Sequence, residues 1–359
     1  MPIAVHQLLV GAAAEDAITN MALATRETLR ENRESEIFSF HRDKGAEDRG
    51  IRTIEQMDDL MPGSALLYHA SFGVPEVTKR VLGWEGPLLL AYHNVTPSVF
   101  FRRFDAVFAD GLDWGREELN IIRGRVRHAF ADSKFNAAEL RNLGYESVTV
   151  NPLGMRPGRL SHVLSDQDLL LRLRTRFREG FVLLVSQVLP HKQMETAISA
   201  THLLNHVFGR RVGLVIVGPH RHPRYLGELE SFCASKPGLD VEFTGSVTDE
   251  HLATYLRNAI CLLSTSAHEG LSLPPLEAMA EETCVLVKSA GALDETIDDG
   301  GLVLPADVGP LEIAGVINHL LDEPDLQTSL RVAGKRRLER LASATDGSSL
   351  SDLIDAALS

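Results

Sequence analysis

Short apolar runs alternate with longer helical patterns along the whole chain, and this alternation limits the possible folds more than any other feature. Strands that are separated by helices form parallel sheets built from βαβ units. The first series of strand-like runs covers residues 3–10, 35–40, 65–68, 88–92, 106–109, 128–131 and 148–150. The second series covers residues 181–186, 212–217, 241–244, 259–264, 284–287 and 301–304. The sequence therefore predicts an α/β protein with two doubly wound, Rossmann-like parallel-sheet domains.

The rhythm breaks between residues 151 and 175, where four prolines and glycines precede a leucine-rich helical stretch without strand character. Such a break predicts an interdomain connector. A length of 359 residues fits two domains of ordinary size. We expect a first domain over residues 1–155, a connector over 156–175, a second domain over 176–340 and a C-terminal helix within 341–359.

Composition and charge exclude several classes of protein. Apolar residues make up 44% and charged residues 24% of the chain, as in soluble globular proteins. No apolar run approaches the ~18 residues of a membrane span, and the N-terminus lacks a signal-like segment, so we expect a cytoplasmic protein. The net charge of -13 argues against nucleic-acid binding. The three cysteines show neither disulfide nor zinc-site spacing.

Two glutamates bracket a turn and a helix start directly after the strand-like run 259–264. Glu269 is expected on the loop at the carboxyl end of this strand, where open α/β sheets bind ligands. Glu277 is expected in the first turn of the following helix, where it can accept hydrogen bonds from ligand hydroxyls.

The helix start itself predicts an anion site. Pro274 and Pro275 suit a first helical turn, because the N–H that proline lacks would have no partner there. The backbone N–H groups of Ser272 and Leu273 are then left facing the entrance. An anion site between two carboxylates favours a ligand that has both phosphate and hydroxyls, such as a nucleotide sugar.

At these residues the chain resembles the retaining glycosyltransferases of the GT-B fold, specifically the family-four group (glycosyltransferase group 1), which is marked by Glu, seven residues and Glu. The resemblance continues through residues 131–136, 217–218, 243–247 and 291–295, and it covers about residues 88–320. It implies that the two domains face a cleft, with the donor on the second domain and the acceptor against the first. It also implies a C-terminal helix that packs back on the first domain.

The resemblance implies transfer of a sugar from a nucleoside-diphosphate sugar to a hydroxyl of a glycan, lipid-linked or small-molecule acceptor. Polysaccharide or cell-envelope glycan assembly is the implied setting. No metal and no other cofactor is expected, because protein donors neutralise the diphosphate. The sugar, the base, the acceptor, the linkage and the oligomeric state stay open.

The resemblance also assigns roles in the donor site. Glu269 is expected to contact donor-sugar hydroxyls and an oxocarbenium-like centre, and Glu277 to hold the ribose hydroxyls. Lys192, where the run 181–186 gives way to a helix, is expected to stabilise the charge that grows on the leaving diphosphate. The donor-binding residues implied are Gln187, Lys192, Val247, Glu269, Gly270, Leu271, Ser272, Leu273 and Glu277.

One departure from the family pattern concerns this leaving group. Related enzymes carry Gly-Arg where this chain has Ser186 and Gln187. Gln187 donates a hydrogen bond but brings no charge, so either Lys192 carries more of the stabilisation or another basic residue assists. Whether the departure lowers activity stays open.

In the first domain, His93 follows the buried run 88–92, and the resemblance places it against the donor sugar as a third catalytic candidate beside Glu269 and Lys192. The alternative is a structural histidine. His69 and Asn94 are expected on the acceptor side. Asp16 is expected either to touch the acceptor or to cap its helix.

Two acidic or histidine-rich patterns do not predict a metal site. Asp166 and Asp168 precede leucines and suit a helix start, and His220 and His222 lack a partner with suitable spacing. A local basic stretch can either contact anionic lipid head groups weakly or form a solvated face: Arg102, Arg103, Arg116, Arg123, Arg125 and Arg127.

Three other functions compete with the transferase hypothesis, since one fold hosts several chemistries. They are a sugar-nucleotide epimerase, a phosphorylase, and a non-catalytic homologue that binds nucleotide sugar or acts as a scaffold. The missing arginine favours the non-catalytic homologue, whereas the two glutamates and Lys192 argue against it.

Overall fold

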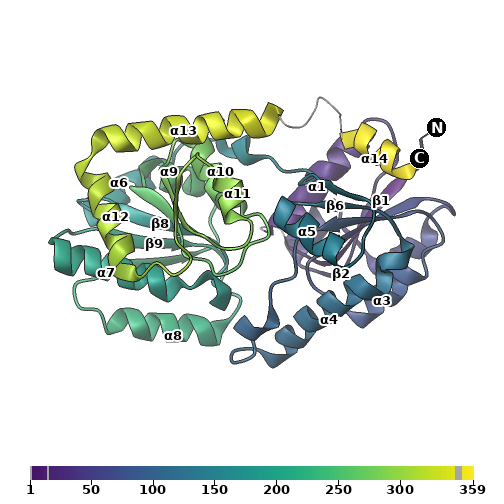
Figure 1. The fold of residues 1–359 in the computed structure, drawn as a ribbon, viewed down its shortest axis with the longest axis horizontal. Coiled ribbons are helices and arrows are strands. Elements are labelled where there is room, and N and C mark those ends of the chain that lie inside the picture. The colour runs from purple at the N-terminus through teal and green to yellow at the C-terminus, as the bar shows by residue number, and fades with distance from the viewer. Residues whose placement is uncertain (1, 14–15, 344–349) are drawn as a thin grey trace. The chain divides into compact units, whose positions relative to one another are not determined.

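The computed structural model describes residues 2–13, 16–343 and 350–359. The chain divides into two compact α/β units, Met1–Arg156 with Thr345–Ser359 and Pro157–Ala344. In each unit helices flank a parallel sheet (Figure 1). The predicted fold class, two doubly wound parallel-sheet domains, is confirmed.

The sheet of the first unit has seven parallel strands in the order β3-β2-β1-β4-β5-β6-β7. The order reverses between β1 and β4, as in a doubly wound sheet. The strands read as nearly continuous apolar runs because helices cover both faces. The strands are β1 (Val5–Ala12), β2 (Ile37–Arg42), β3 (Arg52–Thr53), β4 (Ala65–Ala70), β5 (Leu88–Tyr92), β6 (Val126–Ala131) and β7 (Val148–Val150). The helices of this unit are α1 (Ala17–Leu29), α2 (Lys44–Asp48), α3 (Pro75–Leu82), α4 (Ala106–Ile122), α5 (Lys134–Asn142) and α14 (Leu350–Leu358).

One predicted strand is wrong. Residues 106–109 form the first turn of α4 instead of a strand. The carboxylate of Asp105 accepts a hydrogen bond from the N–H of Phe108 at 2.9 Å, which caps the helix. The apolar residues of this segment therefore belong to an amphipathic helix, a pattern that a four-residue window does not distinguish from a strand.

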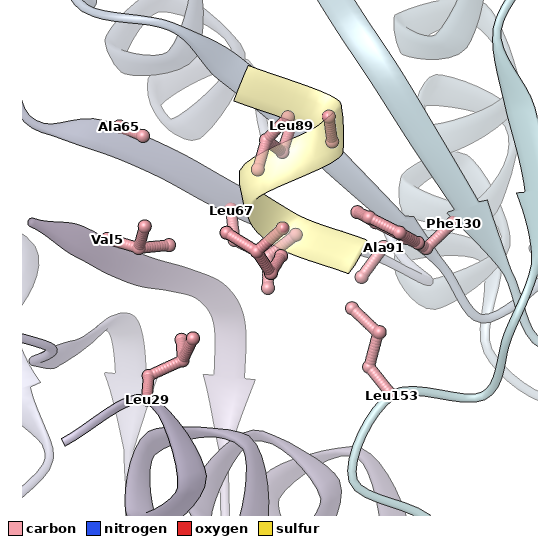
Figure 2. Packing of buried hydrophobic residues seen from close by; sticks show 10 residues of the cluster. Val5, Leu29, Ala65, Leu67, Leu89, Ala91, Phe130 and Leu153 are labelled. Carbon is pink, nitrogen blue, oxygen red and sulfur yellow. The ribbon is translucent and has the colours of Figure 1, made fainter. Parts of the chain in front are cut away.

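The C-terminal helix α14 packs on the sheet of the first unit. Its Ile354 and Ala357 belong to one buried cluster with Leu67 and Leu89 of the central strands and Phe130 of β6 (Figure 2). Polar contacts fix the other side of the helix. The fully buried side chain of Arg33 donates to Ser351 Oγ at 2.7 Å and to Asp355 Oδ2 at 2.9 Å.

The sheet of the second unit has six parallel strands in the order β10-β9-β8-β11-β12-β13, and the order reverses between β8 and β11. The strands are β8 (Phe181–Val185), β9 (Gly213–Val217), β10 (Val241–Gly245), β11 (Cys261–Ser264), β12 (Val285–Lys288) and β13 (Leu302–Leu304). The helices are α6 (Gln167–Arg176), α7 (Met194–Phe208), α8 (Pro223–Ala234), α9 (Asp249–Asn258), α10 (Leu273–Ala280), α11 (Leu293–Ile297), α12 (Pro310–Asp322) and α13 (Pro324–Ser343).

Most of the expected connector belongs to the second unit. It contains the short 3₁₀ helix η4 (Pro157–Leu160) and α6, which contacts α9. Asp166 caps α6 by accepting the N–H of Leu169 at 2.7 Å, so the helix start predicted there is confirmed. At the other end of the unit, α13 packs on α10 and continues beyond the expected boundary at residue 340.

A buried carboxyl group joins α4 to the sheet of the first unit. Glu118 is fully buried and lies 2.8 Å from Tyr68 Oη and 2.6 Å from Thr78 Oγ1. Thr78 Oγ1 also contacts the carbonyl of Val74, which only accepts, and the indole N–H of Trp114, which only donates. With a protonated Glu118 every one of these contacts pairs a donor with an acceptor. Burial raises the pKa of Glu118 to about 7, against hydrogen bonds from Thr78 and Tyr68 that lower it.

We predict that Glu118→Gln flattens the pH dependence of the stability of the first unit. Because the pKa of Glu118 is about 7 in the folded protein and about 4.5 when exposed, protonation stabilises the fold fully below pH 4.5. This stabilisation is lost as the pH rises to about 7, by on the order of 2–3 kcal/mol between pH 5 and pH 8. Urea unfolding followed by tryptophan fluorescence measures it, since both tryptophans, Trp84 and Trp114, lie in this unit.

The exposed neighbour Glu117 on the same helix provides the matched control. Glu117→Gln should keep the wild-type slope of stability against pH. An unchanged slope in Glu118→Gln would contradict the assignment.

Candidate functional site

The loops that follow β8 and β11 meet at the point where the strand order of the second unit reverses. Lys192 ends the 3₁₀ helix η5 (Pro190–Lys192) after β8, and Glu269 lies on the loop after β11. Lys192 Nζ lies 2.6 Å from Glu269 Oε1, and the two side chains are 15% and 10% exposed. Ser266 Oγ donates to the same carboxylate oxygen at 2.6 Å. The structure thus brings together two residues that the sequence proposes from separate segments.

Hydrogen bonds hold these two loops against each other. Thr265 Oγ1 lies 2.9 Å from the carbonyl of Lys192 and 3.0 Å from that of Gln193. The N–H of Ala267 donates to the carbonyl of His191 at 2.8 Å. The relative position of Lys192 and Glu269 is therefore set by the backbone and does not depend on the ion pair alone.

A third loop fixes the backbone of Glu269. The N–H of Ala292 donates to the carbonyl of Glu269 at 2.9 Å. Only glycine allows the backbone at position 291 to come this close to Glu269. The φ of Gly291 is +57°, and a Cβ atom there would lie 2.2 Å from the carbonyl oxygen of Glu269. The glycine of the segment 291–295 thus has a physical reason to be there.

Helix α10 starts beside the ion pair. Ser272, which precedes the helix, has φ 71° and ψ 97°, a conformation that non-glycine residues rarely adopt. Pro274 and Pro275 lack N–H groups, so the N–H groups of Ser272 and Leu273 are the ones that the helix start offers. Lys192, Glu269, Ser272 and both prolines line a hollow of about 10 Å³. A volume that small admits about one water, so a larger ligand would rest over the strand ends.

Glu277 is the fifth residue of α10 and lies in its second turn rather than in the first. It is 8% exposed, and burial raises its pKa while the guanidinium of Arg159 opposes that rise. Arg159 Nε donates to Glu277 Oε1 at 2.7 Å. The sequence interpretation missed Arg159, because only its position after the proline- and glycine-rich break hinted at a site.

The other predicted donor residues lie on the segments that follow β8, β10 and β11. Gln187 is the second residue after β8, and its carbonyl accepts from Ser186 Oγ at 3.1 Å. The carbonyl of Leu271 accepts from Thr296 at 2.8 Å. Gly270 lies on the Glu269 loop, whereas Val247 follows β10, two strands away from β8. A further cation, Lys288 at the end of β12, donates to the side chain of Gln193, and burial lowers its pKa.

In the first unit, buried polar side chains form a hydrogen-bonded chain that runs from Gln7 in β1 to the carboxyl ends of β5 and β6. Gln7 Oε1 lies 2.9 Å from His69 Nε2, and His69 Nδ1 lies 2.8 Å from His93 Nε2. The chain ends at Asp132, whose Oδ2 lies 2.8 Å from His93 Nδ1. Both ring nitrogens of His93 are therefore bonded within the unit, and its side chain is only 2% exposed. This geometry fits the structural alternative for His93.

The hydrogen-bond partners determine where the protons lie in this series of four side chains. Gln7 Nε2 donates to the carbonyl of Ala22 at 3.0 Å, so Gln7 Oε1 faces His69 and must accept a proton from Nε2. Burial lowers the pKa of His69 well below its ordinary value, so His69 is neutral and its Nδ1 accepts from His93 Nε2. His93 Nδ1 faces the carboxylate of Asp132 at the end of the series.

The two remaining predicted residues of the first unit have local roles. Asp16 Oδ2 accepts the N–H of Thr19 at 2.9 Å and so caps α1, the second of its two predicted roles. Asn94 has a φ of 74°, and its amide donates to Asn136 and Glu139 at 3.0 Å each. Such strained backbone is typical of functional sites, and it is consistent with a constrained loop at this edge of the sheet.

The basic stretch of the first unit is largely engaged inside that unit. Arg102 forms ion pairs with two aspartates and Arg116 with Glu139, while Arg123 and Arg125 donate to backbone carbonyls. Less positive charge is thus left for anionic lipid than the sequence suggests. Within the described ranges, no helix is long and apolar enough to cross a bilayer.

The first unit also contains a larger cavity, of about 450 Å³, at the amino ends of β4 and β5. None of the predicted site residues lines it. Open α/β sheets bind ligands at the opposite, carboxyl edge. This cavity is therefore not the candidate site. In the part of the chain that the structure describes, no group of three or more His, Cys, Asp or Glu side chains is arranged to hold a metal ion.

We predict that His69 is neutral, with a proton on Nε2 and none on Nδ1. Nitrogen NMR of histidine-labelled protein measures this, with the signal assigned by its loss in His69→Gln. The exposed Asp110→Asn is the control and should leave the signal unchanged. A proton on Nδ1 of wild-type His69 would show that the inferred proton positions are wrong.

Part of the second unit matches a known family of proteins. Residues 173–337 match the family model for glycosyl transferases group 1. The MMP alpha-(1->4)-mannosyltransferase of Mycolicibacterium hassiacum is 39% identical over 116 residues, which cover 31% of this chain and 28% of that protein. The human alpha-1,3/1,6-mannosyltransferase ALG2 is 26% identical over 242 residues, covering 64% of this chain and 57% of that protein. The aligned parts thus span between about a quarter and somewhat over half of these two relatives.

Solved structures show the same fold at low sequence identity. HepE of Anabaena, in complex with UDP-glucose, has a TM-score of 0.70 and 14% identity, covering 94% of this chain and 99% of that chain. Sucrose-phosphate synthase from Thermosynechococcus elongatus has a TM-score of 0.69 and 17% identity, covering 94% of each chain. The chain therefore shares its fold with these two structures, and its residues 173–337 match the glycosyl transferases group 1 family.

Proposed function

We propose that this chain is a retaining glycosyltransferase that moves a hexose from a nucleoside-diphosphate sugar to a hydroxyl acceptor. The observation that carries the proposal is the contact between Lys192 and Glu269 at the strand-order reversal, beside the start of α10. A cation, a carboxylate and two backbone N–H groups are there within one set of loops. This combination matches a ligand that has a diphosphate next to a sugar.

Each group has capacity left for a ligand. An ammonium has three protons, so Lys192 can keep its bond to Glu269 and still donate to a diphosphate oxygen. Glu269 Oε1 accepts from Lys192 and Ser266, and among the described residues Oε2 has no hydrogen-bond partner. We assign Oε2 to a hydroxyl of the donor sugar.

The proposed chemistry follows from where charge develops. As the glycosyl bond breaks, negative charge grows on the diphosphate, where Lys192 and the N–H groups of Ser272 and Leu273 stabilise it. Positive charge grows on the sugar near the carboxylate of Glu269. Departure of the leaving group and attack of the acceptor on one face of the sugar retain the anomeric configuration, with a phosphate oxygen taking the acceptor's proton. No protein nucleophile and no metal ion enters this scheme.

The names of the relatives guide the choice of donor and acceptor. Both curated relatives described above are mannosyltransferases, so mannose donors are the first to test, followed by UDP-glucose. A glycan or a lipid-linked sugar in polysaccharide or cell-envelope assembly is the acceptor class that we propose, with the reaction taking place in the cytoplasm.

We predict that Glu269→Gln lowers transfer by about a hundredfold or more, as expected when one preorganised stabilising group is removed. Binding of the nucleoside diphosphate should stay within a few-fold of wild type, because Lys192 and the helix start keep their positions through backbone contacts. Transfer is measured with mannose and glucose donors of UDP, GDP and ADP, and binding by thermal shift.

Glu282→Gln, at an exposed glutamate just after α10, is the matched control and should transfer at the wild-type rate. Conversion of a donor into an epimer without acceptor would favour an epimerase. Nucleotide-sugar binding without transfer to any acceptor, in the wild type as in Glu269→Gln, would favour a non-catalytic homologue.

A further inference from the structure

Arg159 bridges two carboxylates of different exposure in the second unit. Its Nε lies 2.7 Å from Glu277 Oε1 on α10, and its Nη1 lies 2.5 Å from Asp249 Oδ1 at the start of α9. The side chain of Glu277 is 10% exposed and that of Asp249 is 58% exposed. One guanidinium thus connects a buried carboxylate of the proposed donor site to an exposed carboxylate.

The bridge affects what Glu277 can bind. A buried glutamate without a counter-charge tends to hold its proton, and burial does raise the pKa of Glu277. Arg159 opposes this effect and so favours the ionised form, which accepts hydrogen bonds at both oxygens. Arg159 occupies Oε1, while Oε2 has no hydrogen-bond partner among the described residues. By binding Oε1, Arg159 therefore leaves Oε2 of Glu277 as the oxygen that can accept a hydrogen bond from a ligand hydroxyl.

A separate contact holds the segment that carries Arg159. Arg257 donates to the carbonyls of Val163 at 2.7 Å and Leu160 at 3.0 Å, and it pairs with Glu281, one turn after Glu277 on α10. The backbone of η4 is thus fixed to α9 and α10 without Arg159. A substitution of Arg159 should therefore change Glu277 and leave the fold of the segment intact.

We propose that Arg159 is a positioning residue that makes Glu277 selective for the vicinal hydroxyls of ribose over 2′-deoxyribose in the donor nucleotide. This inference rests on the proposed function, in which Glu277 holds the ribose. Arg159 acts through Glu277, because it keeps the carboxylate ionised and turned to the ligand. The groups that face Glu277 are Arg159 from η4, Asp249 from α9 and Glu281 from α10.

The test measures, by calorimetry, the affinity of the full chain for UDP, GDP and ADP and for their 2′-deoxy counterparts. Wild type should prefer the ribonucleotide by about ten- to a hundredfold, the range expected for hydrogen bonds to a charged group. Arg159→Gln and Glu277→Gln should each remove most of that preference and leave 2′-deoxynucleotide affinity within about threefold. The double variant should be no weaker than either single variant, because both changes remove the same interaction.

The pH profile separates this role from a merely structural one. In Arg159→Gln the carboxyl of Glu277 loses its counter-charge, so ribonucleotide affinity should rise as the pH is raised and the proton is lost. Wild type should show a flatter profile over the same range. Arg159→Lys keeps the charge and should recover part of the ribose preference. Arg156→Gln, at an exposed arginine paired only with Glu27 among the described residues, is the matched control and should behave as wild type.

The outcomes distinguish the inference from the function on which it rests. If wild type binds none of the nucleotides, the proposed function fails. If Glu277→Gln loses ribose preference and Arg159→Gln keeps it, the function stands and this inference fails. Equal losses for ribose and 2′-deoxyribose ligands in Arg159→Gln, or a flat pH profile, would also overturn it.

Discussion

All strands of each sheet are parallel, and this one constraint determines where polar side chains can gather. Parallel strands bring their carboxyl ends to a common edge, and the reversal of strand order leaves neighbouring loops there without a crossing helix between them. In the second unit the reversal lies between β8 and β11, and there Lys192 meets Glu269. In the first unit, His69 near the end of β4 meets His93, which follows β5, and His93 meets Asp132, which follows β6.

Backbone strain accompanies these loops. Asn94, Gln193 and Ser272 have φ values of 74°, 48° and 71°, which side-chain-bearing residues seldom adopt. Gln193 follows Lys192 and Ser272 precedes α10, both parts of the proposed site, while Asn94 follows the internally bonded His93. The cost of such conformations is borne by the surrounding hydrogen bonds, as in the contact of Thr265 with the carbonyls after β8. The loops are therefore held in one geometry before any ligand arrives.

In the second unit, each of the two carboxylates of the proposed donor site is bonded to a cation. Glu269 is bound by a lysine and a serine, Glu277 by an arginine that also reaches solvent-facing Asp249. A buried carboxylate that keeps one oxygen for a ligand is stable only if the other oxygen is well bonded. The same logic accounts for Glu118 in the first unit, where hydroxyl partners bring no charge and burial raises the pKa of the carboxyl to about 7.

The sequence by itself determined the two parallel sheets, because apolar period and length are local properties, and it also indicated Lys192, Glu269 and the start of α10. It misread residues 106–109, since a four-residue apolar run has no period of its own. Only the tertiary structure decided that His93 is bonded on both ring nitrogens and that Arg159 contacts Glu277, 118 positions away. The physical reason is that hydrogen-bond partners depend on which elements become neighbours in space, and a linear pattern does not carry that information.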